Sequence, residues 1–77
     1  MNKINSNINP IQLYNFAMQM YAEKKYTEAF EIFKKTANYN ETKIESIQMI
    51  AILYAESSQY DNALRLFELS SSIQADN

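Results

Sequence analysis

Acidic side chains are the residues of this chain best suited to perform chemistry, because two carboxylates can act together as general acid and general base. The candidates are Glu23, Glu28, Glu31 and Asp61. The three glutamates stand near lysines, and Asp61 stands where the first turn of a helix favours a negative charge. We therefore interpret all four as solvated charges and helix-end partners, not as a catalytic pair.

Three residue types on which most catalytic and metal sites depend are missing, because the chain contains no His, no Cys and no Gly. It therefore has no imidazole base, no thiolate nucleophile or zinc–thiolate site, and no glycine-rich phosphate loop. We expect a protein that is not an enzyme and that uses no metal and no cofactor.

Charges of both signs are mixed along the chain, and the net charge is −2. The pairs Lys24-Lys25 and Lys34-Lys35 stand beside acidic residues, whereas a nucleic-acid site needs a one-signed basic patch, so we expect no nucleic-acid binding. No apolar run approaches the ~20 residues that cross a bilayer. The opening "MNKINSNINP" has no apolar stretch typical of a secretory signal. We expect a soluble, cytoplasmic protein without membrane insertion.

Apolar residues recur at helical spacing in four segments, which predicts an all-α fold. Asn9 and Pro10 begin the first segment as cap and first helical residue, and a second begins at about Thr27. Thr42 is the predicted cap of the third, and "ESSQ" at 56–59 separates it from the fourth. The side chains predicted to face inward are Leu13, Phe16, Ala17, Met20, Ala29, Phe30, Phe33, Ala37, Ile44, Ile47, Ile50, Ala51, Tyr54, Ala63, Leu64, Phe67 and Ile73.

The chain repeats itself at an interval of 34 residues, because "EKKYTEAFEIF" at 23–33 has the same small and aromatic positions as "SSQYDNALRLF" at 57–67. Short connectors make consecutive helices antiparallel neighbours. We therefore predict one domain, 1–77, built from two stacked helical hairpins, repeat 1 at 10–43 and repeat 2 at 44–77. Each hairpin needs the other to bury its apolar face.

These positions resemble the tetratricopeptide repeat (TPR), a helix–turn–helix unit of 34 residues. A three-helix bundle of the microtubule-interacting type would account for the first half of the chain alone. The resemblance implies a short α-solenoid in which small residues let the paired helices approach closely and aromatic residues fill the space beside them. The residues that carry it are Leu13, Phe16, Ala17, Met20, Tyr26, Ala29 and Phe33 in the first copy, and Ile47, Ile50, Ala51, Tyr54, Tyr60, Ala63 and Phe67 in the second.

Members of that family typically bind peptides or protein segments along a surface lined by the first helix of each repeat. The corresponding apolar residues here are Tyr14, Met18, Tyr21 and Ile52. We predict that they bind an apolar peptide or an amphipathic helix. The alternative is that a neighbouring helix or the N-terminal segment covers them. This surface offers no cation at Tyr14, Met18, Gln48 or Ile52, which argues against a clamp for a partner's terminal carboxylate.

The third helix carries the further apolar residues Met49 and Leu53, whose counterparts Asn15 and Gln19 in the first helix are polar. We predict that Met49 and Leu53 meet a second chain, either another copy or a different protein. The alternatives are that the last helix covers them or that they contact further repeats. The expected function is a non-catalytic interaction module, an adaptor or chaperone-like protein. The alternative is a structural homo-oligomer, natural or designed, whose repeats mainly serve self-assembly.

Overall fold

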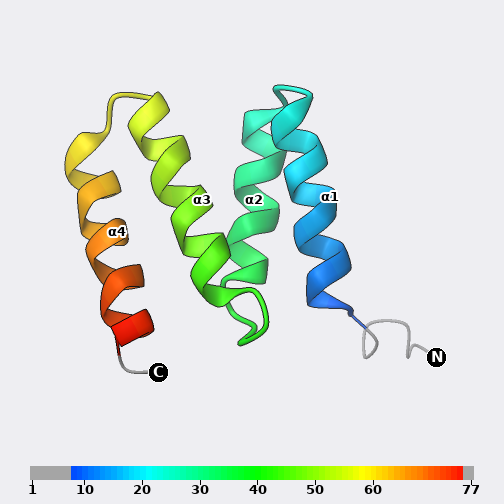
Figure 1. The fold of residues 1–77 in the computed structure, drawn as a ribbon. Helices are drawn as coiled ribbons and strands as arrows, with labels where there is room; N and C mark the ends of the chain where they lie inside the picture. The colour runs from blue at the N-terminus through cyan, green and yellow to red at the C-terminus, as the bar shows by residue number, and fades with distance from the viewer. Residues whose placement is uncertain (1–7, 76–77) are drawn as a thin grey trace.

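The computed structural model describes residues 8–75, and the predicted ends of the domain at 1–7 and 76–77 lie outside this range. It contains four helices: α1 (Pro10–Ala22), α2 (Tyr26–Thr36), α3 (Lys43–Glu56) and α4 (Tyr60–Ala75). Each helix packs against the next, so the hairpin of α1 and α2 stacks on the hairpin of α3 and α4 through α2 and α3 (Figure 1). The predicted all-α arrangement of stacked antiparallel hairpins is confirmed, and the described residues contain no strand.

The first helix begins as its sequence predicts. The Asn9 side-chain oxygen accepts hydrogen bonds from the backbone N–H groups of Ile11 and Gln12, at 3.0 and 3.2 Å. The third helix begins differently. Thr42 occupies the cap position, but its hydroxyl donates to the carbonyl of Thr36 at 2.7 Å instead of accepting from α3. The side chain of Thr42 therefore ties the end of α2 to the start of α3.

The two hairpin turns have the same backbone geometry at positions 34 residues apart. Lys24 and Ser58 both have left-handed backbones, with φ of 64° and 68°. The N–H of the residue after each one reaches back to the preceding helix, Lys25 to the Met20 carbonyl and Gln59 to the Tyr54 carbonyl, both at 2.8 Å. This bond pattern is the Schellman ending of a helix. It reverses the chain tightly even though no glycine is present.

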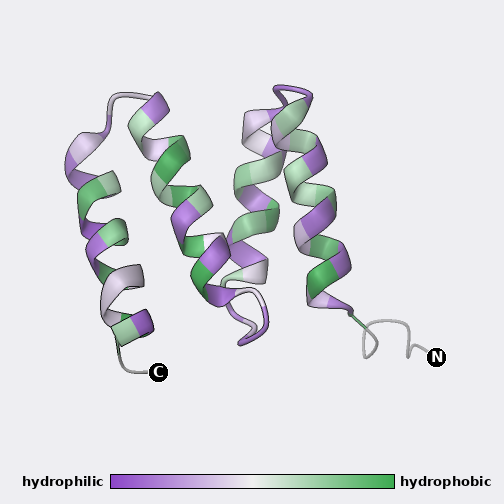
Figure 2. Cartoon of the chain, viewed as in Figure 1, coloured by the Kyte–Doolittle hydropathy of each residue, from purple (hydrophilic) through white to green (hydrophobic). Residues whose placement is uncertain are grey.

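Alanine pairs hold the two helices of each hairpin close together. Ala17 of α1 and Ala29 of α2 have no solvent exposure, and in the second hairpin Ala51 has none and Ala63 is 4% exposed. A larger side chain at these positions would separate the backbones. In Figure 2 the hydrophobic colour lies on the helices, whereas the connectors between α1 and α2 and between α2 and α3 are hydrophilic.

The prediction that Met49 and Leu53 are free to meet a second chain is wrong. Each side chain is only 9% exposed, and both belong to the same core cluster as Ala17, Met20 and Phe33 of the first hairpin. The α3 helix is apolar on several sides because it contacts a helix on each side within the chain. No other described helix covers the corresponding side of α1, which accounts for the polar residues there.

Side chains of the outer helices are more exposed than their sequence pattern predicts. Phe16 of α1 is 49% exposed, whereas its counterpart Ile50 of α3 is 8% exposed. On α4, Leu64 is 59% and Phe67 is 38% exposed, although the counterpart of Phe67, Phe33, is fully buried. The reason is that α2 and α3 each pack closely against two helices, while α1 packs mainly against α2 and α4 packs mainly against α3. The expectation that Phe16, Leu64 and Phe67 point into the core is therefore corrected.

Replacing either left-handed residue with glycine is expected to stabilise the fold. A left-handed backbone costs a non-glycine residue about 1 kcal/mol, which Gly avoids, although Gly also makes the unfolded chain more flexible. We expect Lys24→Gly and Ser58→Gly each to raise the melting temperature by about 3–6 °C. Ser57→Gly is the matched control, because Ser57 has φ of −99° and should lose stability. Equal effects of Ser57→Gly and Ser58→Gly in thermal unfolding would contradict this explanation.

Candidate interaction surfaces

The four residues predicted to bind a partner lie on the first helices of the two hairpins, Tyr14, Met18 and Tyr21 on α1 and Ile52 on α3. All four are half-buried and pack against the core cluster. Part of each side chain is therefore accessible to solvent, and the rest contacts the core. We call this surface the α1/α3 face.

Tyr14 is fixed by contact with the core. Its ring lies 5.5 Å from the ring of Phe33, centroid to centroid, in a tilted arrangement typical of aromatic pairs. Burial raises the pKa of the Tyr14 hydroxyl, and the negative charge of Glu45 on α3 raises it further. This aromatic side chain of α1 therefore stands in the field of a carboxylate from α3.

Tyr21 joins α1 to α3 directly. Its hydroxyl donates a hydrogen bond of 2.6 Å to the carboxylate of Glu56, 35 residues further along the chain. That bond is the main cause of the raised pKa of Tyr21, and burial and the charge of Glu56 add to it. The Tyr21 ring also meets the edge of the Tyr26 ring, with centroids 5.5 Å apart. The carboxyl-terminal ends of α1 and α3 are thus held side by side.

The structural repeat residues fall into two groups. Ala17, Ala29, Phe33, Ala51 and Ala63 are buried, as their predicted packing role requires. In the second group, Tyr26 and Tyr60 at the hairpin turns are 43% and 66% exposed, and Phe67 is exposed as described above. The Tyr21 ring covers part of Tyr26. The counterpart of Tyr21 in the second hairpin is Ala55, which has no ring to cover Tyr60, so Tyr60 is more exposed than Tyr26.

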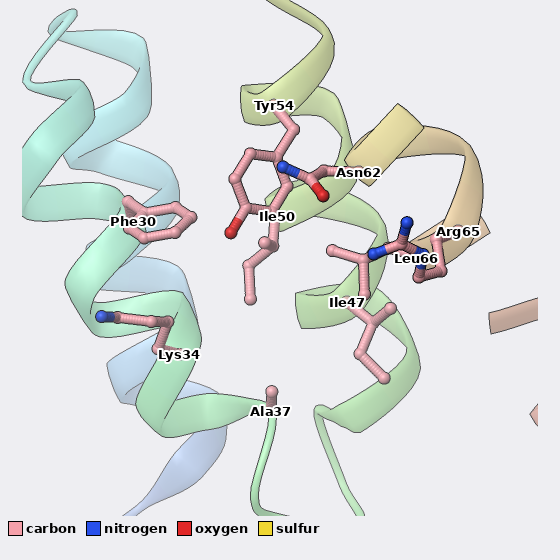
Figure 3. A pocket seen from close by; sticks show the side chains of 9 residues that line it. All are labelled: Phe30, Lys34, Ala37, Ile47, Ile50, Tyr54, Asn62, Arg65 and Leu66. Carbon is pink, nitrogen blue, oxygen red and sulfur yellow. The ribbon is translucent and has the colours of Figure 1, made fainter. Parts of the chain in front are cut away.

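A cleft that the sequence analysis missed lies between α2, α3 and α4 (Figure 3). Its volume is about 460 Å³, and its lining includes Phe30, Ile47, Ile50, Tyr54, Arg65 and Leu66. It is on the opposite side of α3 from the α1/α3 face, because Ile52 and Tyr54 are two residues apart on a helix that turns by about 100° per residue. Comparing the two copies of the repeat does not reveal this cleft, because its cation Arg65 corresponds to an acidic residue, Glu31, in the first copy.

The described residues offer little to hold a metal ion. Among residues 8–75 there is no group of three or more acidic side chains that could share one. The acid with a perturbed pKa is Glu23, whose pKa is lowered by a hydrogen bond from Gln19 and then by one from Lys25. Glu23 is fully exposed, so this shift is typical of a helix end in water. None of the helices in the described range is both long and apolar enough to cross a membrane.

Comparison with protein-family models, with curated proteins and with solved structures finds no match to this chain. The geometry of the two surfaces is therefore the basis for the function proposed below.

Ionisation of Tyr21 is expected to weaken the fold at alkaline pH. The raised pKa means that the neutral hydroxyl is favoured in the folded state, so its contribution is complete below the unfolded pKa of about 10. This contribution is lost as the pH rises through the folded pKa, when a phenolate faces the Glu56 carboxylate. We expect the melting temperature to fall by a few degrees more between pH 9 and pH 11 in the parent than in Tyr21→Phe.

Circular dichroism melting curves at these two pH values measure the difference. Every other residue is the same in both proteins, so the comparison isolates the effect of the Tyr21 hydroxyl. Parallel losses of stability in parent and variant would show that the bond between Tyr21 and Glu56 does not contribute.

Proposed function

We propose that this chain is a non-catalytic interaction module, a TPR-like adaptor or chaperone-like protein, that binds an apolar segment of a partner on the α1/α3 face. The observation that supports this proposal is the row of half-buried residues Tyr14, Met18 and Tyr21 on α1, which Tyr21 and Glu56 join to α3, the helix that carries the half-buried Ile52. Such a surface is apolar and is already ordered before the partner arrives.

The partly buried tyrosines favour binding for an entropic reason. The Tyr14 ring rests on Phe33, and the Tyr21 ring rests on Tyr26, so both rings lose little freedom when a partner covers them. Tyr is among the residues that contribute most to binding energy, and the flexible Met18 can adapt to different apolar partners.

The charges on this surface indicate the chemistry of the partner. Glu45 acts on Tyr14, and Glu56 accepts the hydrogen bond from Tyr21, so carboxylates from α3 border the apolar row. An apolar segment that also carries Lys or Arg would be complementary to them. We therefore propose a partner segment that is both apolar and basic.

Peptide selection followed by mutation tests this proposal. Peptides are selected from a random displayed library on the full chain, and the affinity of the best one is measured by fluorescence anisotropy. We expect selected sequences rich in apolar and basic residues. We expect binding at least about tenfold weaker to the variant Met18→Lys, Ile52→Lys, because apolar contact is lost and like charges meet.

Lys35→Glu is the matched control, because Lys35 is exposed on α2 and Tyr14, Met18, Tyr21 and Ile52 all belong to α1 and α3. Its affinity should match that of the parent, and circular dichroism should show all the proteins to be equally helical. A selected peptide that binds the Lys variant as tightly as the parent would disprove the proposed site.

A second candidate function is self-assembly, and the outer side of α4 favours it. Tyr60, Leu64 and Phe67 are spaced four and three residues apart, so they form one stripe along the helix, which we call the α4 stripe. These side chains are 66%, 59% and 38% exposed. Their counterparts in the first hairpin belong to α2, which α3 covers. An apolar stripe of this kind is typical of an interface.

Light scattering at a series of concentrations tests self-assembly. If the α4 stripe pairs with a second copy, the parent should have a mass above the 9.0 kDa of one chain, and Leu64→Lys, Phe67→Lys should restore that value. Gln74→Lys adds one charge to the same helix at an exposed position and should keep the parent's mass. A parent that stays at one chain's mass at every concentration would exclude this second candidate.

A further inference from the structure

The cleft between α2, α3 and α4 is separate from the α1/α3 face and from the α4 stripe. Its volume of about 460 Å³ lies within the range of ligand clefts in proteins. Three helices from both hairpins contribute to it, so its shape depends on the packing that stabilises the whole fold.

The floor of the cleft is apolar and largely buried. Ile47 and Ile50 of α3 are each 8% exposed, and Leu66 of α4 lies beside them. At one edge the Phe30 ring of α2 meets the Tyr54 ring edge-on, with centroids 5.6 Å apart. A floor of this kind can accept one large apolar side chain without rearrangement.

The rim of the cleft is polar and cationic. Figure 3 shows Arg65 extending from α4 toward the cleft, Asn62 near the Tyr54 ring, and the Tyr54 hydroxyl directed toward Phe30 of α2. Lys34 also lines the cleft from α2, but Figure 3 shows its ammonium directed away from Ile50 and Arg65. It pairs with Glu31 at 3.2 Å and lies over the Phe30 ring at 5.1 Å. The residues that line the cleft include two cations and no carboxylate, although the chain as a whole has a net charge of −2.

Arg65 is the cation available to a ligand. The two ion pairs found among the described residues join Lys25 to Glu23 and Lys34 to Glu31, and neither involves Arg65. An arginine side chain can hold a carboxylate through two parallel hydrogen bonds, which gives it direction as well as attraction.

We propose that this cleft binds a protein segment in which Asp or Glu stands next to a large apolar residue. The carboxylate binds Arg65, and the apolar side chain rests on Ile47 and Ile50. We choose an acidic partner segment because its carboxylate is attracted to Arg65 and no carboxylate lines the cleft to repel it. This site does not depend on the function proposed for the α1/α3 face, where carboxylates favour a basic partner.

Nuclear magnetic resonance titration of the full chain with two matched peptides tests the proposal. The probes are N-acetyl-Glu-Leu-Phe-Glu-amide and its uncharged analogue N-acetyl-Gln-Leu-Phe-Gln-amide. We expect the acidic peptide to shift the methyl signals of Ile47 and Ile50 and to bind about fivefold more tightly than the analogue, a modest effect typical of partly exposed charges. Arg65→Gln should remove this preference, and the control Lys35→Gln should retain it.

Several results would overturn the proposal. One is the absence of any shift at Ile47 and Ile50 with either peptide, and another is equal binding of the acidic and uncharged peptides. A preference that survives in Arg65→Gln would place the carboxylate elsewhere. Octanoate is included as a further probe, and its binding without a response to the acidic peptide would indicate a small amphiphile instead of a protein segment. The Met18→Lys, Ile52→Lys variant separates the two sites, because it should bind the acidic peptide like the parent.

Discussion

The contact between α2 and α3 is the constraint on which the rest of the structure depends, because the two hairpins meet there. Phe33 is fully buried at this junction among Met49, Ile50 and Leu53 of α3. A single hairpin of this size has an apolar face that it cannot bury alone. The same junction brings α3 beside α1, so that Tyr21 reaches Glu56, and it leaves α2 and α4 on either side of the cleft.

A buried pair of hydroxyl groups fixes how the hairpins meet. The side-chain oxygens of Thr36 and Ser46 lie 2.6 Å apart, and neither residue has any solvent exposure. Thr36 also hydrogen-bonds to the Phe33 carbonyl, and its own carbonyl accepts from Thr42. Buried polar groups are costly when they lack partners, so sliding α3 along α2 would leave hydroxyl groups unsatisfied. Apolar contact therefore drives the stacking of the hairpins, and this network selects one register.

The sequence predicts the helices, the antiparallel hairpins and the alanine contacts, because each depends on spacing within one segment or on its repetition. It could not predict which helix covers which face. Met49 and Leu53 have a periodic pattern that indicates an apolar side of α3 but does not identify α2 as its cover. Leu64 and Phe67 have an inward-facing pattern, yet no described helix lies over them. The cleft was missed because its lining comes from three helices and Arg65 has no cationic counterpart.

The two copies agree at the small buried residues of each hairpin and differ in charge at exposed positions. The alanines that recur in both copies, Ala17 with Ala51 and Ala29 with Ala63, are buried, and a larger side chain there would disturb the packing. The recurring tyrosines Tyr26 and Tyr60 are exposed instead. Glu31 and Arg65, which differ in charge, are exposed. Because an exposed position bears little packing constraint, its side chain can change without loss of the fold. On one side of α3, the carboxylates of Glu45 and Glu56 lie near the tyrosines of α1, and on the other side Arg65 of α4 lines the cleft. The two proposed partner segments, one basic and one acidic, would therefore bind on opposite sides of the same helix.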